Sequence, residues 1–177
     1  MSTTLIISAI APNRPGMAND IAHLIQEFGT TILESHMTVM SNEFTVIMEV
    51  TGPWNALAKL EHQLPMKAHK LGMLTMLKRS DKLAEEPKWT AYRVIISDVK
   101  DRGIINQVTS FFAESHVNIE EVNCRTFLAP QSEALNGELK MTVTLDKTQP
   151  FDELRSKFEQ FCKVSNLKAE ITPLKNC

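Results

Sequence analysis

The sequence repeats itself with an offset of 87 residues, and this repeat limits what the chain can fold into. Gly16 and Gly103 (103 − 16 = 87) each follow an apolar run and precede apolar residues at helical spacing. At the same offset Ile21 aligns with Val108. A repeat that spans most of a 177-residue chain predicts two copies of one folding unit rather than a single larger domain.

The first copy shows strand and helix patterns in the order βαββαβ. Strands are predicted at about 4–11, 31–40, 43–51 and 71–79, and helices at about 17–28 and 53–64. Gly29 is expected to stop the first helix in the left-handed conformation. The second helix is expected to turn Trp54, Leu57 and Leu64 to one face. It should end at Pro65, because the residue before a proline is pushed out of helical geometry.

The second copy repeats this order. Its predicted strands are about 91–98, 118–127, 137–146 and 167–174, and its predicted helices are about 103–115 and 150–164. The predicted fold class is therefore α+β, with two ferredoxin-like units, each a four-stranded antiparallel sheet carrying two helices on one face. The first domain is placed at 1–80 and the second at 90–177. A charged, proline-containing linker is placed at 81–89.

The sheet face away from the helices differs between the copies. In the first copy Ile6, Ile10 and Ile47 point to that face, so a second surface should cover it. The second copy of the unit and a second chain are both candidates. In the second copy Lys140 and Thr142 lie on that face, which predicts a sheet with one solvated side.

Composition favours a soluble protein that does not bind nucleic acid directly. The net charge is −2, whereas neutralising phosphates usually requires a basic excess. The N-terminus lacks the pattern of a signal peptide, and no apolar run approaches the length of a membrane span. The three cysteines are widely spaced, which suggests reduced thiols and a cytoplasmic location.

The two glycine turns are the candidate ligand sites, because free N–H groups at the start of a helix favour an anion such as a carboxylate. The candidate residues of the first turn are Asn13, Arg14, Gly16, Met17, Ala18 and Asn19, and those of the second are Asp98, Asp101, Gly103, Ile104 and Ile105. The acids of the second turn suit an ammonium group and oppose a carboxylate. The simpler alternative is a plain connection between strand and helix.

Other functional classes find little support in the residues. A βαββαβ unit is also the RNA-recognition architecture, but that module stacks bases on aromatic side chains of its central strands. The third strand of the first copy has Phe44 alone, and its counterpart has no aromatic residue. The sequence shows no acid, base and nucleophile that would converge to form an enzyme's active site. The sequence also lacks the closely spaced cysteine or histidine pairs that would indicate a metal site. We expect no cofactor.

Several short segments in a fixed order resemble the ACT domain family of small-molecule-sensing modules. They are Asn13-Arg14-Pro15-Gly16, Asn42-Glu43-Phe44-Thr45-Val46-Ile47-Met48, Trp54-Asn55-Ala56, Leu64-Pro65 and Lys78-Arg79. The second copy is a weaker match, with Asp101-Arg102-Gly103 where the first has Arg14-Pro15-Gly16. The resemblance covers nearly the whole chain and includes no catalytic or DNA-binding domain.

The resemblance implies a non-enzymatic regulator of transcription. Such a protein would sense an amino acid, with glycine as the suggested signal, and would act by contact with a DNA-binding activator. We also expect the two domains to pack against each other and the chain to pair into a homodimer. A stand-alone interaction or allosteric module that regulates a metabolic enzyme is the alternative.

Overall fold

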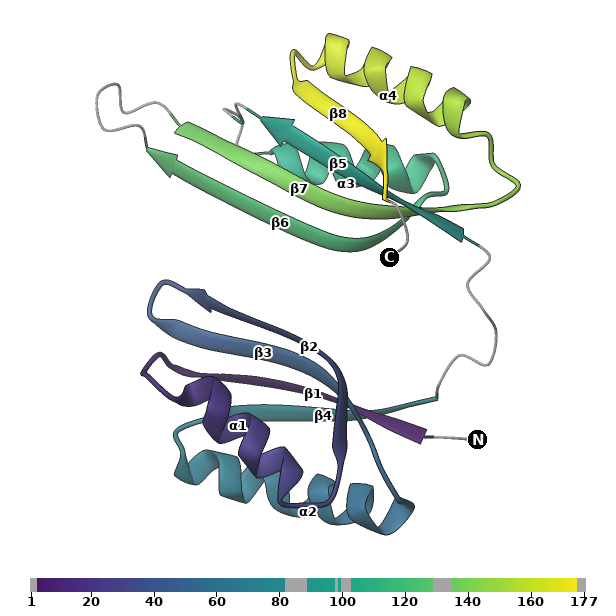
Figure 1. Ribbon diagram of the computed structural model, residues 1–177. Coiled ribbons are helices and arrows are strands. Elements are labelled where there is room, and N and C mark those ends of the chain that lie inside the picture. The colour runs from purple at the N-terminus through teal and green to yellow at the C-terminus, as the bar shows by residue number, and fades with distance from the viewer. Residues whose placement is uncertain (1–2, 82–88, 98, 100–102, 129–134, 175–177) are drawn as a thin grey trace. The chain divides into compact units, whose positions relative to one another are not determined.

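The computed structural model describes residues 3–81, 89–97, 99, 103–128 and 135–174. The chain divides into two compact units, residues 1–85 and residues 86–177 (Figure 1). The first unit contains β1 (Thr3–Pro12), α1 (Met17–Gln26), β2 (Thr31–Met40), β3 (Glu43–Thr51), α2 (Trp54–Lys70) and β4 (Leu74–Asp81). The second contains β5 (Trp89–Ser97), α3 (Ile104–Glu114), β6 (Asn118–Leu128), β7 (Leu135–Asp146), α4 (Phe151–Val164) and β8 (Lys168–Pro173).

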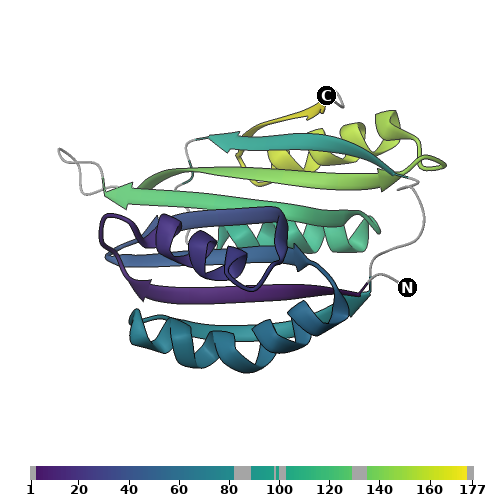
Figure 2. The same ribbon diagram turned by 60° about the horizontal axis from the view of Figure 1, so that its bottom comes forward.

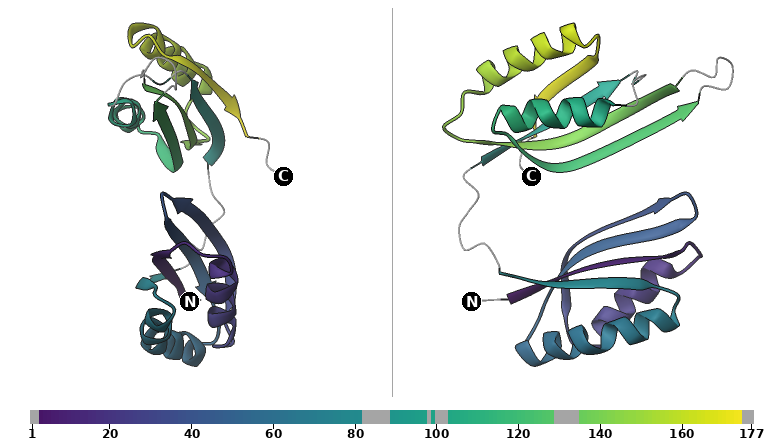
Figure 3. Two further views of the ribbon diagram at one scale, coloured as in Figure 1. Left: turned by 90° about the vertical axis from the view of Figure 1, so that its left-hand side faces the viewer. Right: turned by 180° about the vertical axis from the view of Figure 1, so that it is seen from behind.

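Both sheets have the same antiparallel topology. The strand order is β2-β3-β1-β4 in the first unit and β6-β7-β5-β8 in the second. Figure 2 shows α1 and α2 lying over one face of the first sheet, and Figure 3 shows each unit as a sheet layer with a helix layer. The predicted α+β class, with two ferredoxin-like βαββαβ units, is therefore confirmed.

Each unit has its own apolar core between the sheet and its two helices. In the first unit the buried residues of β1, including Leu5 and Ile7, pack with Ile21 and Ile25 of α1. In the second unit the core is more aromatic, with Phe112 and Phe158 stacked at 5.5 Å between ring centroids. Because apolar burial is the main driving force of folding, each unit carries its own stabilising core.

The predicted end of α2 at Pro65 is wrong, because the helix continues through the proline to Lys70. Leu60, Leu64 and Ala68 are fully buried along one stripe, so ending the helix at Pro65 would remove Ala68 from the core. Pro65 lies on the exposed side, and it has no N–H to donate to the carbonyl of Glu61, so the helix loses that hydrogen bond. Core burial thus outweighs the local preference of the proline.

Trp54 also departs from its predicted place. It opens α2 with 71% of its surface exposed, while Leu57 and Leu64 are buried as predicted. Gly29 does take the left-handed conformation after α1, with φ of 71°, as predicted. Each of the other helices is likewise followed by a left-handed residue, namely Gly72, His116 and Asn166.

The outer faces of the two sheets differ as predicted. On the first sheet Ile10, Ile47, Leu74 and Met76 are 41%, 51%, 68% and 71% exposed. On the second sheet the outer positions carry polar and charged side chains. They include Arg93, Ser97, Glu138, Lys140, Thr142, Lys168, Glu170 and Thr172, while Ile95 of β5 is apolar.

The predicted linker lies mostly outside the described residues, between the end of β4 and the start of β5. None of the helices in the described part of the chain is long and apolar enough to cross a bilayer.

Candidate functional site

The turn between β1 and α1 is shaped by Gly16. Its φ is +93°, a left-handed conformation that residues with a side chain rarely adopt. Met17 follows as the first helical residue and is buried, so it fixes the start of α1 against the core. The first intrahelical bond runs from the Asp20 N–H to the Gly16 carbonyl at 2.8 Å. No side chain caps this helix end, but the Met17 N–H donates to the Arg14 carbonyl at 3.4 Å, so the N–H groups of Ala18 and Asn19 are the ones left for a ligand.

Arg14 supplies a positive charge beside these N–H groups. Its guanidinium forms an ion pair with the Asp20 carboxylate at 2.7 Å and donates to the Pro15 carbonyl at 3.4 Å. A Cβ built on Gly16 would lie 3.9 Å from Arg14 Nη1, so the guanidinium lies alongside the glycine. An anion bound here would meet both the helix N-terminus and Arg14, and would compete with Asp20 for the arginine.

The same turn is tied to the neighbouring hairpin. The Asn13 N–H donates to the carbonyl of Asn42, between β2 and β3, at 2.8 Å. The side chains of Asn13 and Asn19 are exposed, as is Ala18. The structure therefore brings the predicted residues of the first turn together, all of them exposed except Met17, which is buried. Whether they bind a ligand stays a prediction.

The second turn does not repeat the backbone of the first. Gly103 has φ of −89°, a conformation open to any residue, so the predicted equivalence of the two glycines is wrong in this respect. Ile104 is buried and Ile105 is half-exposed. Asp98 and Asp101 lie outside the described residues. The geometry of this turn therefore supports a ligand site less strongly than the geometry at Gly16.

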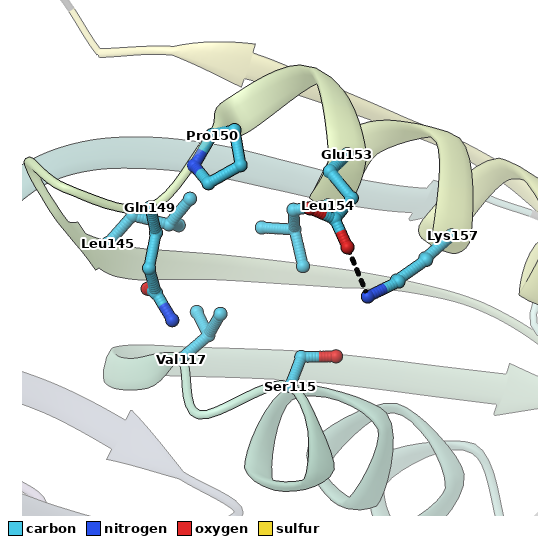
Figure 4. Close-up of a pocket in the computed structure, with 8 residues that line it drawn as sticks. All are labelled: Ser115, Val117, Leu145, Gln149, Pro150, Glu153, Leu154 and Lys157. Atoms are coloured by element: carbon cyan, nitrogen blue, oxygen red, sulfur yellow. Dashed lines mark hydrogen bonds and ion pairs between the residues drawn. The ribbon is translucent and has the colours of Figure 1, made fainter.

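A pocket that the sequence did not suggest lies at the other end of α3, about 16 Å from Gly103 along the 11-residue helix. It has a volume of about 110 Å³. It is lined by Ser115, Val117, Leu145, Gln149, Pro150, Glu153, Leu154 and Lys157 (Figure 4). One difference between the repeats could have indicated it. Ser115 aligns with Phe28, so a hydroxyl replaces an aromatic ring.

The cysteines do not form a reactive centre in the described part of the chain. Burial raises the pKa of the Cys124 thiol, and burial with a smaller effect from the Glu159 carboxylate raises the pKa of Cys162 to about 11. Both thiols are therefore held in the unreactive, protonated form near neutral pH. Among the described residues, no group of three or more histidine, cysteine or acidic side chains is placed to hold a metal ion.

The fold and the turn lead to a known family. Residues 3–78 match the family model described as ACT domain. Residues 3–78 form an ACT domain. The second unit has the same element order and the same sheet topology, so the chain is a tandem of ACT-like domains.

Longer comparisons cover nearly the whole chain. It is 28% identical over 167 residues to the glycine cleavage system transcriptional repressor of Escherichia coli (strain K12), an alignment that covers 94% of this chain and 88% of that protein. The crystal structure of a "putative glycine cleavage system transcriptional repressor" has a TM-score of 0.75 at 21% identity and 99% coverage of both chains. An unknown protein from Galdieria sulphuraria has a TM-score of 0.76 at 17% identity, covering 99% of this chain and 100% of its own. The two solved structures support the fold.

Proposed function

We propose that this tandem ACT protein is a non-enzymatic, cytoplasmic regulator of transcription that acts by contact with a DNA-binding activator. The observation that carries the proposal is the alignment with the glycine cleavage system transcriptional repressor, because it extends over 94% of the chain and 88% of that protein. The net charge of −2 supports a partner of a DNA-binding protein better than a protein that binds DNA itself.

The signal in this proposal is a small amino acid, with glycine as the first candidate. The Gly16 turn supports it, because uncapped N–H groups and Arg14 together favour a carboxylate. Ligand binding would change the affinity for the activator only if the ligand binds two arrangements of the protein unequally.

The test is isothermal titration of the full-length protein with glycine and a panel of other amino acids. Binding that is lost in Gly16→Val, while the variant keeps its circular dichroism spectrum, supports the turn as the site. Unchanged affinity in Gly16→Val removes this turn from the site. If no amino acid of the panel binds, the result favours a module that only binds another protein, and the partner protein should then be sought.

The exposed outer face of the first sheet supports a homodimer. The register places Met76, Ser8 and Ile47 side by side in one row across β4, β1 and β3. The next row along β1 contains Lys78, Ile6 and Glu49. A two-fold axis along β1 would place each Lys78 opposite the Glu49 of the second copy, so the face is complementary to itself in charge and in apolar surface.

The outer face of the second sheet offers no such apolar match, because Glu170 and Lys140 flank Ile95 where Met76 and Ile47 flank Ser8 in the first unit. We therefore propose a second copy of the first unit as the occupant. Light scattering should show a dimer that Met76→Lys dissociates, while the control Thr142→Lys, at an outer position of β7, does not. The charge exchange of Lys78→Glu with Glu49→Lys should restore what each single change weakens. A monomeric wild-type protein would refute this interface.

A further inference from the structure

The exposed side of α2 in the first unit carries two large apolar side chains. Trp54 is 71% exposed and Met66 is 61% exposed. Both belong to one line of residues spaced four apart, which forms a ridge across the surface of a helix. The members of this α2 ridge are Trp54, Ala58, His62, Met66 and Lys70. None of them is buried, so the α2 ridge lies on the side of the helix layer that faces away from the sheet (Figure 2).

The corresponding line of residues on α4 makes its contacts within the second unit. α2 begins with Trp54 and α4 begins with Phe151, each directly after a proline. The Phe151 ring stacks on Tyr92, with the ring centroids 4.2 Å apart and the planes at 11°. The next two members of the line, Arg155 and Glu159, form an ion pair at 3.0 Å. The second unit thus uses this line internally, whereas in the first unit Trp54 stays exposed.

The free charges around the α2 ridge are positive. Lys59 and Lys70 are exposed, and neither has an ion-pair partner in the part of the chain that the structure describes. The one acid of α2, Glu61, is held by Arg79 of β4 at 2.7 Å. Lys70 lies in the last turn, where a cation suits the helix dipole, but Lys59 lies in the middle of the helix, where the dipole does not explain it. The α2 ridge therefore complements a surface with acids beside apolar side chains.

These charges distinguish the possible occupants of the α2 ridge. A second copy of α2 would bring two more lysines against Lys59 and Lys70, without a free acid to offset them. A nucleic acid would require a wider basic surface than two lysines on a chain whose net charge is −2, and it would leave the apolar side chains unmatched. An amphipathic helix with acids along its apolar side matches both the charges and the apolar side chains.

We propose that the α2 ridge is the docking surface for an acidic amphipathic helix of the DNA-binding activator, so this inference rests on the proposed function. Trp54 and Met66 are the apolar anchors of the contact, because a tryptophan is a frequent hot spot and a methionine adapts its shape to a partner. Lys59 and Lys70 pair with acids of the partner helix. The proposed dimer surface lies on the other face of the first sheet, so both contacts can form at once.

The test compares three probes on the full-length protein. The first is an acidic peptide with leucine at helical spacing and glutamate elsewhere, the second replaces each glutamate with lysine, and the third is a short DNA duplex. Titration calorimetry measures affinity, and ¹H–¹⁵N spectra locate the site. The acidic peptide should shift the signals of residues 54–70 and should bind more weakly as salt is added. The basic peptide and the duplex should leave these signals unchanged.

Two pairs of variants make the result specific. Trp54→Ala should weaken binding of the acidic peptide by roughly tenfold or more, as expected for an aromatic anchor. Its control is Val164→Ala on α4, which shortens an apolar side chain that is 83% exposed and should leave the affinity unchanged. Lys59→Glu should weaken binding and reduce its salt dependence, whereas Lys163→Glu makes the same charge change on α4 without effect. All four side chains are exposed, so the circular dichroism spectrum should stay that of the wild type.

Shifts at residues 54–70 that Trp54→Ala removes support the docking surface. Equal binding of the basic peptide or of the DNA duplex overturns the acidic partner. Shifts on the outer face of the first sheet that Met76→Lys removes assign the peptide to the dimer surface and overturn the proposal, as does the absence of any response at millimolar concentrations.

The amino-acid titration separates this inference from the proposed function. Binding of an amino acid at the Gly16 turn, without a response to the acidic peptide, would leave the sensor standing and refute the docking surface. A response to the peptide at residues 54–70, without binding of any amino acid, would support the docking surface and refute the sensor.

Discussion

The φ angles of Gly16 and Gly103 differ, and this difference leads to a testable prediction. Each residue is the N-cap of a helix in its unit, but φ is +93° at Gly16 and −89° at Gly103. Alanine should therefore be costly at the first position and nearly neutral at the second. The pair of variants Gly16→Ala and Gly103→Ala compares these two backbone conformations.

The magnitude follows from the geometry. At Gly16 the nearest heavy atom to an added Cβ, outside the adjoining residues, is Arg14 Nη1 at 3.9 Å, an ordinary contact, so no clash adds to the cost. What remains is the left-handed conformation of a residue with a side chain, about 1–2 kcal/mol. The poorer N-cap preference of alanine and the reduced freedom of the unfolded chain affect both positions alike. Gly16→Ala should thus destabilise by about 1–2 kcal/mol more than Gly103→Ala.

Urea unfolding followed by far-ultraviolet circular dichroism measures the loss, and hydrogen–deuterium exchange read by mass spectrometry assigns it to one unit. Protection should fall within the first unit in Gly16→Ala. Equal free energies of unfolding for the two variants would show that the turn does not require the left-handed conformation, and the account of the candidate site would fail with it.

Three further predictions concern stability and reactivity. Pro65→Ala should stabilise the first unit by about 1–3 kcal/mol in urea unfolding, because it restores the helical bond to the Glu61 carbonyl; no gain would mean that α2 is distorted there. Gly137→Ala should destabilise the second unit by about 1–3 kcal/mol in the same assay, because its Cβ would lie 2.4 Å from the Arg125 carbonyl oxygen. Cys162 should resist iodoacetamide at pH 8 until the protein unfolds, as checked by mass spectrometry of its peptide, because its pKa is about 11 against 9.0 for an ordinary thiol. Since only the unfolded thiol ionises between those values, the stability contributed by Cys162 should be fully present below pH 9 and fall as pH rises toward 11.

Much of the fold was readable in the sequence because it depends on local patterns. The repeat at 87 residues, the alternation of apolar residues in the strands and the helical spacing after Gly16 predicted both βαββαβ units. The exposed apolar face at Ile10 and Ile47 was also predicted, because side chains in a strand alternate between the two faces. The candidate turn at Gly16 could be located for the same reason: it lies at the junction of two such patterns.

The tertiary structure decided the features that depend on contacts between distant segments. α2 runs through Pro65 because the burial of Ala68 against the core outweighs one lost backbone bond. Gly16 and Gly103 look alike in sequence, yet they adopt different backbone conformations. The pocket exists because Ser115, at the end of α3, meets a loop about 35 residues further along the chain, where the first unit has the ring of Phe28. Sequence patterns fix which side of an element faces the core. The space left between elements depends on every side chain that packs there.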